Sequence, residues 1–229
     1  MPLAPIEQEL RVNERKIGET THLTYIFDAL CGWCYGFSST FVEFYNRHHD
    51  SLPCEVISGG LFVNERCKPL AAFPYISGAN ARITHLTGAV FGEPFEALVR
   101  DGTLILDSEA AAAGFVALRT QAPEQSVALA AAMQSAFFRD GKSLSDPATY
   151  AEIAAAFNLS SDAVIAEFAN PTATIEALQD FSKADELEAR SFPRLLLHVD
   201  GQTHTLAQGF APLERLEEKL AGFIGRSRI

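Results

Sequence analysis

Two cysteines separated by two residues, in the tetrapeptide Cys31-Gly32-Trp33-Cys34, constrain this sequence more than any other feature. An apolar run typical of a buried strand, residues 23–30, precedes them, and apolar residues at helical spacing follow them. The pair therefore stands at a strand-to-helix junction, where the free amide groups and the dipole of the helix stabilise a thiolate. Such a thiolate can attack a disulfide, and the second thiol can then resolve the mixed disulfide. Thiol–disulfide exchange is thus the first functional hypothesis.

The residues around the pair predict a β-α-β unit. Residues 23–27 are rich in β-branched and aromatic residues, which predicts a strand. Phe37, Phe41 and Phe44 recur at helical spacing, which predicts a helix that ends near His48. Residues 54–58 predict a second strand, which Gly59-Gly60 ends; we favour a turn there over a close approach to a ligand. A strand, a helix and a strand within forty residues favour a parallel strand pair.

The rest of the chain divides into a helical block and a second strand-containing unit. Residues 71–185 are rich in alanine and repeat helix-capping signals, and we see no strand pattern within them. Residues 194–199 and 202–207 predict a hairpin around Asp200-Gly201, and residues 212–223 predict a closing amphipathic helix. This order predicts an α/β, thioredoxin-like fold. Residues 22–70 and 186–229 would form one discontinuous domain, residues 71–185 an all-helical insertion, and residues 1–21 a polar lead-in with an edge strand or a short helix.

Two segments connect this order to a known family: Asp28-Ala29-Leu30-Cys31-Gly32-Trp33-Cys34-Tyr35-Gly36, and Ser191-Phe192-Pro193 just before the hairpin. Over residues 22–225 the chain resembles the DsbA family of thiol–disulfide oxidoreductases, and within it the FrnE-like group of predicted protein-disulfide isomerases. The resemblance implies a helical insertion in a thioredoxin fold. It also implies a cis-proline at Pro193 that faces the cysteines, and a substrate that binds the backbone of Phe192.

The candidate site residues follow from these two segments. Cys31, nearest the helix N-terminus, is the expected nucleophile, and Cys34 is the expected resolving thiol. Trp33, the only tryptophan, either forms an apolar docking patch for substrate or folds back onto the protein. Asp28 is either a proton acceptor for Cys34 or the cap of a turn.

The sequence also departs from the family pattern. Many relatives carry a small or β-branched residue before the cis-proline, whereas Phe192 is bulky and either restricts access or adds an apolar contact. Gly32-Trp33 replaces Pro-His between the cysteines, which removes a cation beside the thiolate. We therefore expect a reduction potential in the reducing half of the range from about −120 mV for DsbA to about −270 mV for thioredoxin.

The other two cysteines offer little support for a metal site. A zinc site would need a second ligand pair, but Cys54 and Cys67 are far apart in sequence and the chain has no His-x-x-x-His pattern. We therefore predict no bound metal. Cys54 begins an apolar strand and is expected to be buried, whereas Cys67 follows a polar turn and is expected to be exposed; a disulfide between them stays open.

Composition narrows the partners and the compartment. The net charge of −11 disfavours nucleic acid and anionic membranes as partners. The first twenty residues contain no apolar stretch of the length of a secretory signal, so we expect a cytoplasmic protein. The expected partners are disulfide- or thiol-containing proteins or glutathione, with no cofactor other than glutathione as a co-substrate. Oxidase, reductase and isomerase activities stay open, as does the oligomeric state.

Two other classes of function stay open. Kappa-class glutathione transferases and 2-hydroxychromene-2-carboxylate isomerases share the architecture but use a serine at the position of Cys31. The presence of both cysteines argues against their chemistry, although a glutathione-linked reaction such as deglutathionylation stays compatible. The third class is non-enzymatic: a redox sensor, or an adaptor whose helical block binds a partner.

Overall fold

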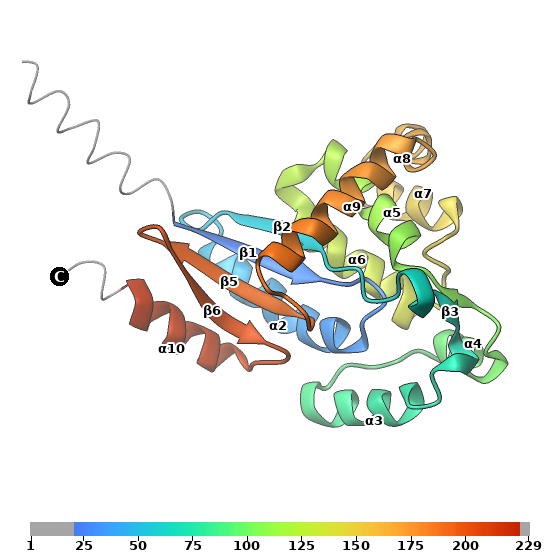
Figure 1. Ribbon diagram of the computed structural model, residues 1–229, viewed down its shortest axis with the longest axis horizontal. Helices are drawn as coiled ribbons and strands as arrows, with labels where there is room; N and C mark the ends of the chain where they lie inside the picture. Colours follow the sequence, from blue (N-terminus) through green and yellow to red (C-terminus); the bar gives the residue numbers. More distant parts are fainter. Residues whose placement is uncertain (1–20, 225–229) are drawn as a thin grey trace, which may run out of the picture.

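The computed structural model describes residues 21–224, and the predicted lead-in therefore lies outside the described residues except for Thr21. Figure 1 shows a four-stranded sheet flanked by helices. In chain order the elements are β1 (His22–Phe27), α2 (Gly32–His48), β2 (Cys54–Ser58), η1 (Asn64–Arg66), β3 (Lys68–Pro69), η2 (Leu70–Ala72), α3 (Ile76–Thr87), α4 (Glu93–Asp101), β4 (Ile105–Leu106), α5 (Ser108–Gln121), η3 (Pro123–Gln125), α6 (Ser126–Phe138), α7 (Pro147–Ala156), α8 (Ser161–Phe168), α9 (Pro171–Glu186), β5 (Arg194–Val199), β6 (Gln202–Gln208) and α10 (Leu213–Ile224).

The sheet has the strand order β2-β1-β5-β6. Strands β1 and β2 pair in parallel, as the β-α-β pattern predicted, while β5 pairs antiparallel with both β1 and β6. The β5–β6 hairpin turns at Asp200 and Gly201, where φ is 52° and 72°. Positive φ at both central residues is the requirement of a type I′ turn, which Asp-Gly meets. The thioredoxin-like fold predicted from the order of the elements is confirmed.

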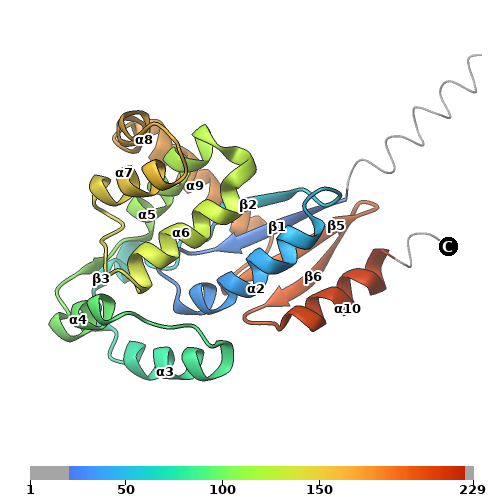
Figure 2. The same cartoon turned by 180° about the vertical axis from the view of Figure 1, so that it is seen from behind.

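Helices cover both faces of the sheet. Helix α9 contacts β2 on the face toward the viewer in Figure 1, whereas α2 and α10 lie next to each other on the opposite face, which Figure 2 shows. Helix α2 forms because Phe37, Phe41 and Phe44 line one buried stripe, and Arg47 and His48 complement the dipole in its last turn. Helix α6 packs on α2 and joins the helices between β2 and β5 to the sheet.

An ion pair between a partly buried arginine and a buried aspartate also fastens these helices to the sheet. The guanidinium of Arg119, on α5, donates to both carboxylate oxygens of Asp180, on α9, at 2.7 and 3.0 Å. Asp180 also accepts the backbone N–H of Ser58 at 3.0 Å, at the end of β2. Burial raises the pKa of Asp180, against the lowering effect of Arg119. The pair thus fixes the end of β2. Just after this end, the backbone N–H of Leu61 donates to Asp28, which precedes the cysteines.

The region between β2 and β5 differs in one respect from the prediction of helices alone. Residues 68–69 and 105–106 form an antiparallel ribbon, β3–β4. The prediction of no strand there was wrong, because two-residue strands are too short to leave a periodic pattern. No described helix is long and apolar enough to cross a bilayer. Buried side chains of the sheet and of the helical block form one continuous cluster, and the division into domains stays a prediction.

Candidate active site

Cys31 and Cys34 lie at the N-terminal end of α2, directly after the buried strand β1. Cys31 is the N-cap residue, and its backbone N–H donates to the Asp28 carbonyl oxygen at 3.1 Å. Cys34 is one turn further into the helix and is fully buried, whereas 6% of Cys31 is exposed. The two thiols are therefore unequal: Cys31 is the one at the surface of the site.

The surroundings of Cys34 keep it protonated. Burial raises the pKa of the Cys34 thiol well above its ordinary value, and the hydrogen bond to Cys31 and the charge of a Cys31 thiolate raise it further. The backbone N–H of Asp28 donates to Cys34 Sγ at 3.5 Å and acts in the opposite direction. A thiol that stays protonated until its neighbour has reacted has the properties of a resolving thiol.

The loop before β5 faces Cys31. The Phe192–Pro193 peptide bond is cis, and Arg194 begins β5 immediately afterwards. Cys31 Sγ donates to the carbonyl oxygen of Phe192 at 3.7 Å, so residues more than 150 positions apart meet here. The structure therefore places the Phe192–Pro193 loop next to Cys31, as the family resemblance implies.

Gly59 allows the loop that contains Phe192 to lie close to the end of β2. A Cβ atom at Gly59 would lie 2.2 Å from Cε1 of Phe192, closer than real contacts permit. The Phe192 ring thus packs over Gly59, against the end of β2. The sequence interpretation of Gly59-Gly60 as a turn missed this close approach, whose partner is a side chain of the same protein.

Asp28 occupies a buried position beneath the pair. Its Oδ1 accepts the N–H of Leu30 at 2.9 Å and its Oδ2 accepts the N–H of Leu61 at 2.7 Å. Burial raises the pKa of Asp28, although hydrogen bonds from Leu61, Ser108 and Leu30 and the charge of Arg66 lower it. Asp28 therefore caps the turn before Cys31, one of its two predicted roles. Its second role, as a proton acceptor for Cys34, stays a prediction.

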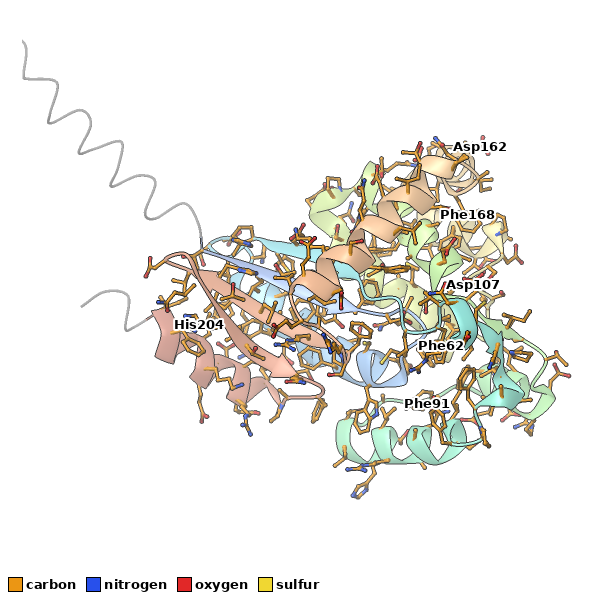
Figure 3. The ribbon with its side chains drawn as sticks, in the orientation of Figure 1. Phe62, Phe91, Asp107, Asp162, Phe168 and His204 are labelled. Carbon is orange, nitrogen blue, oxygen red and sulfur yellow. The ribbon has the colours of Figure 1, made fainter. Side chains whose placement is uncertain are left out.

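A cavity of about 350 Å³ opens beside Cys31. Trp33 is half-buried in its wall and packs against the core, while the guanidinium of Arg82 lies 6.0 Å from its ring. Figure 3 labels Phe62, which lines the cavity from the segment after β2. The other lining residues are Leu30, Cys31, Gly32, Leu61, Arg66, Leu70, Tyr75, Ile76, Ala79, Asn80, Ile83, Phe95, Leu106, Phe137, Phe138, Arg190, Ser191 and Phe192.

Sequence reasoning missed the wall that α3 forms. One signal was present at Gly36, two residues after Cys34. A Cβ atom there would lie 2.6 Å from Cγ2 of Ile83, because α3 packs directly on the first turns of α2. A glycine inside a helix that offers no turn often marks such a close approach.

The remaining cysteines lie away from the cavity. All four cysteines are free thiols, so the structure contains no Cys54–Cys67 disulfide. Cys54 and Cys67 are both partly buried, and burial raises the pKa of each thiol. Within residues 21–224, no group of three or more His, Cys, Asp or Glu side chains is arranged to hold a metal ion.

No family model matches the sequence, and no curated protein matches it either. Solved structures do. A candidate protein disulfide isomerase from Nitrosomonas europaea is 20% identical with a TM-score of 0.77, covering 91% of this chain and 99% of its own. The cytosolic disulfide reductase DsbM from Pseudomonas aeruginosa is 25% identical with a TM-score of 0.74, over 89% of this chain and 98% of its own.

More distant structures share the same architecture. The oxidoreductase DsbA from Xylella fastidiosa is 13% identical with a TM-score of 0.54, over 93% of this chain and 88% of its own. The structural neighbours are thus DsbA-like thiol–disulfide oxidoreductases. The chain has the DsbA-like thioredoxin fold, with a helical insertion between its two halves and a Cys-x-x-Cys pair at the start of helix α2.

Proposed function

We propose that this protein is a thiol–disulfide oxidoreductase in which Cys31 is the attacking nucleophile and Cys34 the resolving thiol. One observation carries the proposal: Cys31 lies between a helix N-terminus, a cavity and the Phe192 carbonyl, while Cys34 is fully buried directly behind it. The DsbA-like fold supports the same chemistry.

The reaction would proceed in two exchanges. The Cys31 thiolate attacks one sulfur of a substrate disulfide, forms a mixed disulfide and releases the other sulfur as a thiolate, which takes up a proton. Cys34 then loses its proton and attacks Cys31, which releases the second substrate thiol. The protein has given two electrons and holds a Cys31–Cys34 disulfide. A second thiol compound must reduce that disulfide before the next cycle.

The surroundings of the pair suggest how substrate is held. Trp33 would offer an apolar contact beside the thiols, and the Phe192 backbone next to Pro193 would hydrogen-bond the substrate. Asp28 would accept the proton that Cys34 releases, since it lies buried beneath the pair. Because the Phe192 ring packs over Gly59, it would contribute an apolar contact without closing the cavity.

We favour net reduction in a reducing compartment over oxidation. The Gly32-Trp33 dipeptide places no cation between the cysteines, and DsbM, one of the structural neighbours, is a cytosolic disulfide reductase. DsbM has also been determined with GSH, which supports glutathione as the co-substrate that regenerates the pair. Equilibration of the protein with glutathione redox buffers should give a potential nearer about −270 mV than about −120 mV.

Two serine variants test the proposal. Cys31→Ser should abolish reduction of small and protein disulfides, because no other thiol lies at the cavity. Cys34→Ser should attack once and then accumulate a mixed disulfide that mass spectrometry detects. Cys54→Ser and Cys67→Ser are the matched controls and should keep the full rate. A Cys31→Ser protein with the wild-type rate would refute the assignment.

A further inference from the structure

The cavity beside Cys31 has a charge opposite to that of the whole chain. The chain carries a net charge of −11, yet the charged side chains that line the cavity are Arg66 and Arg190, and no described lining residue is an aspartate or a glutamate. Arg66 ends η1, and Arg190 precedes the cis-proline loop. Two separate segments therefore bring cations to the same opening.

Both guanidinium groups are free to bind a ligand. Neither makes an ion pair within the described part of the chain, whereas Arg47 pairs with Glu43 and Arg100 pairs with Glu93. Arg66 stacks loosely over the Phe62 ring, with Cζ 5.7 Å from the ring centre. The positive charge of Arg66 also acts on the turn before Cys31, because it lowers the pKa of Asp28. An exposed arginine beside a cavity is suited to bidentate binding of a carboxylate.

A third polar group lies deeper in the wall. Asn80, on α3, is only 5% exposed, and its Nδ2 makes no hydrogen bond with any described group. Its side chain adjoins the active-site helix, because Oδ1 lies 3.7 Å from the position that a Cβ atom would take at Gly32. Buried amides are normally paired, so an unpaired one in a cavity wall needs an explanation such as a bound acceptor.

We propose that this cavity selects small disulfides that carry carboxylates, with Arg66 and Arg190 binding the carboxylates and Asn80 donating to an acceptor oxygen of the substrate. The proposal rests on the proposed function, because it assigns the substrate class of the same site. A volume of about 350 Å³ is in the range of small-molecule sites. Covalent chemistry is unchanged: Cys31 displaces one carboxylate-bearing thiol, Cys34 displaces the other, and an added dithiol reduces the resulting Cys31–Cys34 disulfide.

A series of disulfides that differ in charge tests this selection. Reduced protein is mixed with dianionic dithiodiglycolate, neutral hydroxyethyl disulfide or dicationic cystamine, and oxidation of the pair is followed by the fluorescence of Trp33. Each rate is divided by the rate of the same disulfide with dithiothreitol, which corrects for leaving-group reactivity. We expect about a tenfold preference for the dianion over the neutral disulfide at low ionic strength, weakened by salt. Glutathione disulfide should be preferred in the same way.

Variants assign the preference to residues. Arg66→Gln combined with Arg190→Gln should lower the normalised rate with the dianion to that with hydroxyethyl disulfide, while Arg47→Gln, at the far end of α2, should keep the preference. Asn80→Leu should raise the KM for the dianion without lowering thermal stability, since it removes an unpaired buried donor. Equal normalised rates for the three disulfides, or equal loss for all three in the double variant, would overturn the selection. Loss of every rate in Cys31→Ser, by contrast, tests the proposed function alone.

Discussion

The cavity has two walls of different origin, and they divide the work of the site. The wall from the thioredoxin-like half carries the reacting groups: Cys31, with Cys34 behind it, and the Phe192–Pro193 loop. The wall from the helical insertion carries no thiol. It supplies α3, whose Asn80 and Ile83 face the same space. The reacting groups therefore all belong to one half, while the other half completes the wall of the cavity.

This difference explains why the same reaction can serve different substrates on one architecture. The thiol pair needs only a helix N-terminus and a facing loop, which the sheet fixes through β1, β2 and β5. The insertion can change its packing without moving the thiols, provided that its attachment to the sheet persists. The attachment passes through Arg119 and Asp180 on one side and through Gly36 on the other. Variants at these contacts separate the two walls.

The largest effect is expected at the ion pair between Arg119 and Asp180. Arg119→Met would leave the Asp180 carboxylate buried without its cation, which costs about 3–5 kcal/mol of unfolding free energy. Urea unfolding of the single variant and of Arg119→Met combined with Asp180→Leu measures this cost. The double variant should recover part of it, because no charge stays buried, although the N–H of Ser58 then loses its acceptor. Equal destabilisation of both proteins would show that packing, not charge, holds α5 and α9 to β2.

An intermediate effect is expected where α3 meets α2. Gly36→Ala would force a Cβ atom to 2.6 Å from Ile83, so α3 must shift, at a cost of about 1–3 kcal/mol by overpacking. Gly222→Ala, in α10, is the matched control: it meets no atom within 4 Å and should stabilise its helix by roughly 0.5–1 kcal/mol.

Activity shows whether the shift stays in the insertion wall. Ile83→Ala removes the clash but also empties a buried position, so the two substitutions together should cost less than the sum of their separate costs. Cys31 should still react with hydroxyethyl disulfide in the shifted protein. Loss of that reaction in Gly36→Ala would contradict the division of the site into two independent walls.

The same division decides what the sequence could predict. The strand before Cys31, the helix after it and the hairpin at Asp200 have strong local signals, and the structure bears them out. Asp146, Ser160 and Asn170 cap helices α7, α8 and α9, in agreement with the helix-capping signals that residues 71–185 repeat. Local periodicity and capping fix such elements because neighbouring residues supply the whole signal.

Features that depend on distant residues were missed. The β3–β4 ribbon joins residues nearly forty positions apart and is two residues long, so no periodic pattern marks it. Asn80 and Arg66 carry no motif and reach the cavity only through tertiary packing. Asp28 was assigned two alternative roles, and only the hydrogen bonds from Leu30 and Leu61 show that it caps the turn.

The smallest effect concerns Asp28 and appears as a pH dependence. Burial raises its pKa above 3.8 in the folded protein, so the folded state binds this proton more tightly than the unfolded chain does. The contribution of Asp28 to the unfolding free energy is fully present below the pKa that Asp28 has in the unfolded chain. It is lost as the pH rises through the pKa that Asp28 has in the folded protein. Each unit of the shift corresponds to about 1.4 kcal/mol.

Asp28→Asn removes this titration, although it also loses one acceptor for the N–H groups of Leu30 and Leu61. The free energy lost with this acceptor does not depend on pH, whereas the cost of ionising the buried Asp28 carboxyl in the wild-type protein does. The unfolding free energy of Asp28→Asn relative to wild type should therefore increase from pH 4 upward and level off above the folded pKa. Ser108→Ala, which removes a hydrogen bond that lowers the Asp28 pKa, should move the levelling point to higher pH. A difference that is constant across the pH range would mean that Asp28 ionises in the folded protein as it does in the unfolded chain, and a buried proton acceptor beneath Cys34 would then have no support.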